Sequence, residues 1–119
     1  MGITEIQIKI ANPKNPKKQE KLQFLIDSGA TYSVVPGEVL KRLGVRPHSK
    51  EEFILADGTK IERDRGDALF FFDGKQGASP VIFGKKRDGV LLGVVTLESL
   101  GFVLDPIRRQ LRSLPMLLA

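Results

Sequence analysis

Cysteine is absent from the 119 residues, and histidine occurs once, as His48. Without cysteine the chain has neither a disulfide framework nor a thiolate metal site. A single histidine in an expected loop does not build a zinc site alone, so we expect no metal and no cofactor. No apolar run approaches the ~20 residues of a membrane helix, and the first residues lack the basic and apolar regions of a signal peptide. We therefore expect a cytoplasmic protein without a membrane partner.

The chain carries a formal net charge of +5, but its basic residues are scattered. They fall in expected turns and near the C-terminus, and aromatic residues that would stack on bases are not interleaved with them. This distribution favours solvated turns over a nucleic-acid surface, so we expect no nucleic-acid partner. The length predicts one domain, residues 1–119, which is too short for a two-lobed architecture.

The most informative stretch is Phe24–Pro36, in which an apolar run ends on Asp27, small residues follow, and apolar chain resumes. A carboxylate after three apolar residues is expected at the edge of the interior, where its charge must be compensated. Ser28 has a hydroxyl that can donate, and Gly29 lets backbone amides or a substrate come close. The alternative interpretation is an ordinary strand-to-loop turn in which Asp27 and Ser28 bond backbone amides.

The run from Leu25 to Val35 resembles the active-site loop of the aspartic proteases, with Asp-Ser-Gly-Ala between apolar flanks. The resemblance implies that Asp27 is catalytic, supported in its loop by Ser28, Gly29 and Ala30, and that the substrate is a polypeptide. It also implies that the Ser28 hydroxyl braces two such loops against each other.

An aspartic protease needs two carboxylates that share a proton. This chain has one Asp-Ser-Gly; Asp57-Gly58-Thr59 has a scrambled order and is typical of a turn. The second carboxylate must therefore come from another copy of the chain, and a two-fold axis is the commonest way to supply it. The resemblance implies the same, because retropepsins, the viral-type branch of the family, are homodimers of short chains.

Alternating apolar residues predict a strand over 6–10, and apolar runs predict strands over 22–26, 33–35 and 80–83. An exposed connection is expected over 12–18, hairpin turns at Asp73-Gly74 and Asp88-Gly89, and a short helix over 36–44. A hairpin is expected over about 53–72, with a tip formed by Ala56, Asp57, Gly58 and Thr59. Its position after the catalytic loop matches the retropepsin flap, which closes over substrate. The alternative is an exposed hairpin whose charges block edge pairing.

Leu91, Leu92 and Gly93, followed by an expected short helix, resemble the second signature of the family, which packs beside the active-site loop. Gly93 would be required where two backbone segments cross too closely for a side chain. A last hairpin is expected over 102–114. Because an apolar C-terminus needs covering, residues of about 102–119, and Pro115–Ala119 above all, are candidates for the dimer interface; the alternative is a tail that packs on its own subunit or is disordered.

The resemblance is closest to stand-alone cellular and prokaryotic retropepsin-like domains. It implies an all-β fold, a closed acid-protease barrel with one or two short helices, acting as a two-fold symmetric homodimer. The function expected from it is an aspartic endopeptidase. The alternative is a catalytically silent homodimeric module of the same fold that binds peptides or serves as a scaffold.

Overall fold

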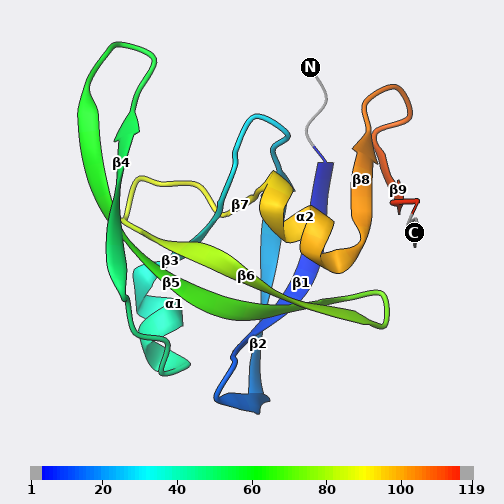
Figure 1. The fold of residues 1–119 in the computed structure, drawn as a ribbon, viewed down its shortest axis with the longest axis horizontal. Helices are drawn as coiled ribbons and strands as arrows, with labels where there is room; N and C mark the ends of the chain where they lie inside the picture. The colour runs from blue at the N-terminus through cyan, green and yellow to red at the C-terminus, as the bar shows by residue number, and fades with distance from the viewer. Residues whose placement is uncertain (1–3, 116–119) are drawn as a thin grey trace, which may run out of the picture.

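The computed structural model describes residues 4–115. Within them the chain forms strands joined by short turns, with two short helices, and the predicted all-β class is confirmed (Figure 1). The strands are β1 (Thr4–Asn12), β2 (Asn15–Ile26), β3 (Ser33–Pro36), β4 (Ser49–Ile54), β5 (Lys60–Phe72), β6 (Lys75–Gly84), β7 (Leu91–Leu92), β8 (Phe102–Asp105) and β9 (Gln110–Ser113). The helices are α1 (Gly37–Arg42) and α2 (Val94–Leu100).

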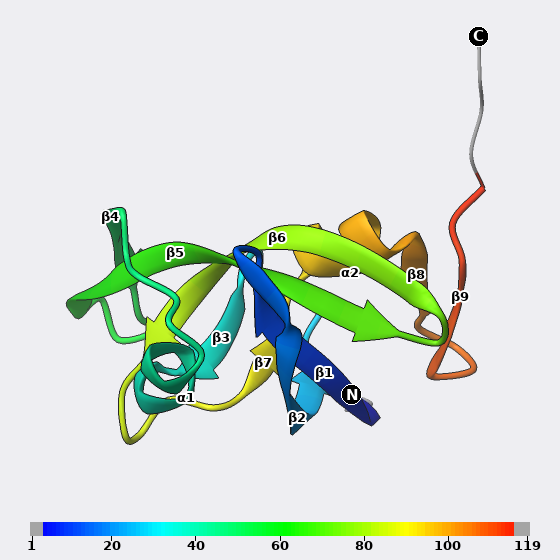
Figure 2. The same ribbon diagram turned by 90° about the horizontal axis from the view of Figure 1, so that it is seen from below.

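The main sheet has seven strands in the order β1-β2-β7-β3-β6-β5-β4. Strand β1 also pairs with β5 through residues 9–11, so the succession of pairings returns from β5 to β1 and leaves β4 outside this circuit. Two pairings are parallel, β2 with β7 and β3 with β6, and the other neighbours are antiparallel. Strands β8 and β9 form a separate two-stranded sheet. Seen from below in Figure 2, α1 and α2 lie at different ends of the strongly twisted strands.

The core lies between the strands of this circuit and α2. The alternating residues of β1 bury Ile8 and Ile10, as their period of two predicts. Phe24 and Phe70 pack with their ring centroids 6.1 Å apart. Each large apolar side chain removed from water stabilises the fold by roughly 1.5–3 kcal/mol. The core also takes in apolar residues of other strands and of both helices: Ile26, Val35, Leu40, Val81, Leu92, Leu97 and Leu100.

Helix α1 forms where it was predicted. Pro36 precedes the first helical residue, where its fixed φ suits entry into a helix, and Gly44 takes a φ of 81° beyond the last turn. Val39, Leu40 and Leu43 are buried on one face of the helix. Neither helix of the described residues has the length and apolar character required to cross a membrane.

The predicted exposed connection over 12–18 is wrong in extent. The turn is confined to Pro13 and Lys14, and β2 begins at Asn15 because this polar segment continues the antiparallel ladder with β1. The ladder is irregular there, since the pairing of Asn12 with Asn15 is followed by that of Ala11 with Gln19. Pro16 lies within the irregularity, where its missing N–H costs no ladder hydrogen bond.

The predicted hairpin over 53–72 also has different bounds. Strand β4 begins at Ser49 and its pairing with β5 ends at Arg65, so the hairpin spans residues 49–65 and projects from one end of the sheet (Figure 1). Residues 68–72 belong to the same long strand β5 but pair with β6. Apolar residues alone did not reveal β4, because its exposed polar positions alternate with half-buried ones.

Of the two predicted Asp-Gly turns, one forms a hairpin and one does not. Asp73 and Gly74 both have positive φ, 52° and 75°, and connect β5 to β6 in a two-residue turn. Asp88 and Gly89 lie in the loop between β6 and β7, which are not neighbours because β3 lies between them. The hairpin predicted near the C-terminus forms from β8 and β9. Of the apolar end predicted as an interface, residues 116–119 lie outside the described residues.

Candidate active site

Asp27 lies directly after β2, in the loop that leads to β3. Its backbone N–H donates to the carbonyl of Leu92, 3.1 Å away, which continues the pairing of β2 with β7 into the loop. Its carboxylate Oδ1 accepts a 2.8 Å hydrogen bond from the N–H of Gly29. Asp27 is exposed in the single chain, so the expectation that it sits at the edge of the interior is wrong for one copy alone. The loop therefore presents an exposed carboxylate from a fixed backbone.

The other predicted loop residues surround this carboxylate. Ser28 and Gly29 are exposed, and Ala30 is half-buried. A Cβ on Gly29 would lie 3.2 Å from Oδ1 of Asp27, so a side chain there would crowd the carboxylate. The N–H of Ala30 donates to the carbonyl of Asp27, 3.0 Å away, which closes the turn. Such an arrangement can hold a water molecule against the carboxylate and accept a proton from it.

Helix α2 supports the loop from its other side. The N–H groups of Val94 and Val95 donate to the carbonyls of Ala30 and Thr31, at 2.9 and 3.1 Å. These bonds satisfy amides at the start of the helix that have no partner within it. Gly93, which precedes the helix, crosses the loop so closely that a Cβ would lie 2.5 Å from the carbonyl carbon of Tyr32. The close crossing predicted for Gly93 is therefore present, and it fixes α2 against the loop.

A chain of buried hydroxyl groups lies behind the loop and was not predicted. The Ser33 hydroxyl accepts the N–H of Gly93 at 2.9 Å and contacts the Thr96 hydroxyl at 2.5 Å. The Thr96 hydroxyl in turn lies 2.8 Å from that of Ser79. All three side chains are buried, so each needs these partners. The available signal was a hydroxyl residue within each of three otherwise apolar stretches, which implies that such residues bond one another.

The four residues predicted for the hairpin tip are exposed and lie at the turn between β4 and β5. Leu55 and Thr59 close the turn with a 2.8 Å backbone hydrogen bond, and Gly58 has a φ of 86°. The hydrogen bond with Thr59 lowers the pKa of Asp57. Within the described residues no hydrogen bond joins this tip to the loop of Asp27.

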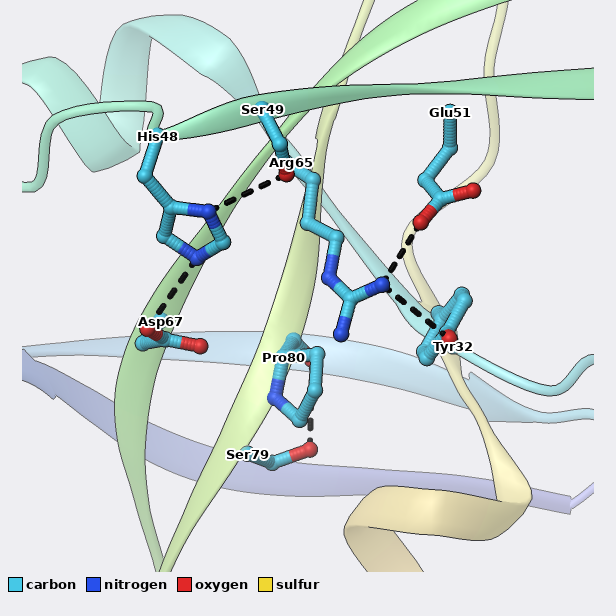
Figure 3. A network of polar contacts seen from close by, with 8 residues as sticks. All are labelled: Tyr32, His48, Ser49, Glu51, Arg65, Asp67, Ser79 and Pro80. Carbon is cyan, nitrogen blue, oxygen red and sulfur yellow. Dashed lines mark hydrogen bonds and ion pairs between the residues drawn. The ribbon is translucent and has the colours of Figure 1, made fainter.

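Two arginines of β5 connect the base of the hairpin to neighbouring loops, and neither was predicted. Arg65 bonds Tyr32, which lies in the loop of Asp27, and Glu51 of β4 (Figure 3). Arg63 bonds Asp88 in the loop between β6 and β7. Both arginines lie in residues 60–66, a segment rich in charged residues. The sequence shows this charge but does not indicate which residues the arginines bond.

The pair of Arg63 and Asp88 is bidentate and mostly buried. Nε and Nη2 of Arg63 donate to the two carboxylate oxygens at 2.7 and 3.1 Å, and the N–H of Lys85 donates at 2.7 Å. The hydrogen bond from Arg63 is the main cause that lowers the pKa of Asp88. Because the pKa is lower in the folded chain than in the unfolded one, the ionised carboxylate stabilises the fold above pH about 4. This contribution disappears as the pH falls through the lowered pKa.

We expect Asp88→Asn to reduce the free energy of unfolding by about 1–2 kcal/mol at neutral pH, because it removes a charge-assisted pair. The difference from the wild type should narrow as the pH is lowered below about 4. Urea denaturation of both proteins at several pH values measures it. Glu62→Gln, which removes the carboxylate of an exposed pair with Lys50, is the control and should have a smaller effect. A difference that does not change with pH would contradict the assignment.

No group of three or more His, Cys, Asp or Glu side chains in residues 4–115 is arranged to hold a metal ion. The site is instead defined by an Asp-Ser-Gly-Ala loop at the end of a strand and by an Leu-Leu-Gly segment that crosses it. An all-β fold with this pair of elements defines the class of aspartic proteases.

Comparisons with known proteins agree with this class. The family described as aspartyl protease matches residues 7–73, so the chain belongs to that family. Simian foamy virus protease is similar in structure, with a TM-score of 0.55 and 23% identity over 80% of this chain and 92% of the viral one. A retropepsin-like aspartic protease from Rickettsia conorii has a TM-score of 0.44 and 22% identity over 87% of this chain and 95% of its own. A search of curated proteins found no match. The predicted membership is confirmed, and the fold is retropepsin-like.

Proposed function

We propose that the protein is an aspartic endopeptidase in which two copies of the chain, related by a two-fold axis, each contribute Asp27 to one active centre. The observation that carries the proposal is the exposed Asp27 carboxylate on a loop that α2 and Gly93 fix in place. One chain has a single Asp-Ser-Gly sequence, and the chemistry requires two carboxylates. Within residues 4–115, the circuit of strand pairings supports the proposal that the chain folds as one acid-protease barrel domain.

In the proposed mechanism, one proton is shared by the two Asp27 carboxyl groups, because two like charges a few ångströms apart do not both ionise at low cost. The ionised carboxylate takes a proton from a bound water molecule, whose oxygen attacks the peptide carbonyl. The protonated carboxyl group donates its proton to the carbonyl oxygen. The tetrahedral intermediate then collapses: the carboxyl group that took the proton from water donates it to the peptide nitrogen, the other carboxylate takes a proton from a hydroxyl of the intermediate, and the C–N bond breaks. No covalent enzyme intermediate forms.

The exposed parts of the chain fit the proposed dimer. The Ser28 hydroxyl is exposed beside Asp27, where it is free to brace the loop of a second copy. Strands β8 and β9 pair only with each other within the described residues, so each has a free edge. The turn between them exposes 90% of Ile107 and lies against the N-terminal strand, since the Thr4 hydroxyl bonds the carbonyl of Arg109. We propose residues 102–119 as the main part of the interface.

The hairpin of residues 49–65 is proposed as the flap that closes over the substrate. Its arms project beyond the sheet, and in Figure 1 its tip points to the same side as the loop after β2. Ile54 and Leu55 are 68% and 44% exposed beside the tip. Exposed apolar side chains at the tip of a hairpin are removed from water when a peptide covers them, and closure would exclude water from the carboxylates.

The dimer is tested by measuring specific activity on an unfolded protein substrate over a range of chain concentrations. We expect activity per chain to rise with concentration and to level off, because a second copy supplies half of the active centre. Analytical ultracentrifugation under the same conditions should place the monomer–dimer transition at the same concentration. A protein that stays monomeric while its activity per chain is constant would contradict the proposal.

A further inference from the structure

Arg65 joins three segments that are far apart in the sequence. It lies on β5, and its Nη1 donates to Oε1 of Glu51 on β4 at 2.6 Å and to the Tyr32 hydroxyl at 3.2 Å. Its guanidinium carbon also lies 4.6 Å from the centroid of the Tyr32 ring, within the range of a cation–π contact. Figure 3 shows the two hydrogen bonds leaving one nitrogen of the guanidinium. Through this one side chain, β5 is therefore joined both to β4 and to the loop that contains Tyr32.

The loop that Arg65 binds is the one that carries Asp27. Tyr32 follows Asp27 by five residues, and its carbonyl carbon is the atom that Gly93 approaches most closely. The neighbouring Thr31 carbonyl accepts the N–H of Val95. The far end of the loop is thus held by α2 through its backbone and by the hairpin through the side chain of Tyr32. Arg65 therefore places the base of the hairpin in direct contact with this loop.

A contribution to stability alone does not explain the contacts of Arg65 with Glu51 and Tyr32 well. Nε of Arg65 is a buried side-chain nitrogen without a hydrogen-bond partner in the described residues. A buried donor without an acceptor is costly, so this loss offsets part of what the other contacts contribute. Glu51 keeps 33% of its side chain exposed and can be hydrated if its partner is removed. What arginine adds, and an apolar side chain of similar length does not, is a planar group that bonds two acceptors and stacks on an aromatic ring.

We propose that Arg65 is a positioning residue for hydrolysis, which rests on the proposed function: it holds the hairpin of residues 49–65 in register with the loop of Asp27. Closure of the hairpin over a peptide and the placement of the carboxylate are then coupled through one contact with Tyr32. The ion pair between Arg63 and Asp88 holds the same hairpin to a different loop. A substitution of Arg65 therefore leaves the base of the hairpin anchored and removes its contact with the loop of Asp27.

The kinetic test compares Arg65→Met with Arg42→Met. Arg42 is the last residue of α1 and pairs with Glu20 of β2, so this variant makes the same chemical change and breaks an arginine–carboxylate pair outside both the hairpin and the loop. We expect Arg65→Met to lower kcat/KM by about tenfold, with KM changing more than kcat, since a smaller fraction of hairpins closes productively. The melting temperature should change by about 3 °C or less. Tyr32→Phe, which keeps the ring, should shift KM in the same direction by less.

A loss of activity that only parallels a loss of stability, or equal effects of Arg65→Met and Arg42→Met on kcat/KM, would overturn the proposal. A second measurement does not depend on turnover. Hydrogen exchange is followed in chains that also carry Asp27→Asn, and Arg65→Met should speed exchange in residues 49–65 and 28–33 but not in the core strand β1. If the wild type hydrolyses no substrate but exchange is faster in these two segments alone, the proposed function fails while the coupling of hairpin and loop through Arg65 is supported. If exchange is unchanged, or faster throughout the chain, that coupling is refuted.

Discussion

Replacing Asp27 with asparagine is expected to reduce kcat/KM for peptide hydrolysis by about 10³-fold or more, while the fold is retained. The amide cannot share a proton as a carboxyl pair does, so no group activates the water. The fold should survive because Asp27 is exposed and because an asparagine oxygen can still accept the hydrogen bond from Gly29. Hydrolysis of denatured casein and of a peptide library at about pH 4 to 6 measures the loss, with circular dichroism as the check on folding.

The matched control for this experiment is Asp73→Asn. It makes the same chemical change at the turn between β5 and β6, where the residue has a φ of 52° that asparagine also tolerates. We expect activity close to that of the wild type. Activity unchanged in Asp27→Asn would remove the catalytic assignment. Absence of activity from the wild type and the variant alike would favour a silent module that binds peptides.

The largest effect on stability is expected from Gly93→Ala. The added Cβ would lie 2.5 Å from the carbonyl carbon of Tyr32 and 2.7 Å from the carbonyl oxygens of Thr31 and Tyr32. These atoms are backbone. The loop is held by hydrogen bonds from α2, and Gly93 is itself held by the bond from its N–H to the Ser33 hydroxyl, so neither segment can move aside cheaply. We expect the free energy of unfolding to fall by about 3 kcal/mol or more, because overpacking against backbone is among the most damaging substitutions.

Gly89→Ala is the control for Gly93→Ala. A Cβ there would lie 3.4 Å from the end of the Leu91 side chain, which is ordinary contact with a flexible group. Urea denaturation of the two variants and the wild type measures both effects, and the control should change the free energy of unfolding by about 0.5 kcal/mol or less. Equal stability of Gly93→Ala and the control would show that the crossing of loop and helix is looser than described.

Local patterns predicted the elements that local residues determine. The alternation of Ile6, Ile8 and Ile10 gave β1, Pro36 and Gly44 bounded α1, and Asp73-Gly74 gave a two-residue hairpin turn. Each of these depends on neighbours in the sequence, on a period of two or on the φ preference of a single residue. The crossing at Gly93 was predicted because glycine after two apolar residues matches a family signature.

What the sequence did not reveal depends on partners far along the chain. The parallel pairings of β2 with β7 and of β3 with β6 join residues 66 and 48 positions apart, and no local pattern marks them. In the hydroxyl chain, the local sequence marks each hydroxyl residue by its apolar neighbours but does not indicate that Ser33 and Thr96 are partners. The exposure of Asp27 was not foreseen because the expectation rested on the three apolar residues before it, whereas burial ends with Ile26 and the next three residues of the loop are exposed.

The proposed mechanism depends on one active centre being built from two chains, and a mixing experiment tests this most directly. Wild-type chains are combined with an equal amount of Asp27→Asn chains at constant total concentration, and a differential tag verifies that subunits have exchanged. If both carboxylates are required, the mixture should keep about one quarter of the hydrolysis rate of pure wild type, because only that fraction of dimers has two aspartates. A rate of about one half would mean that each Asp27 acts by itself, and would contradict the paired mechanism.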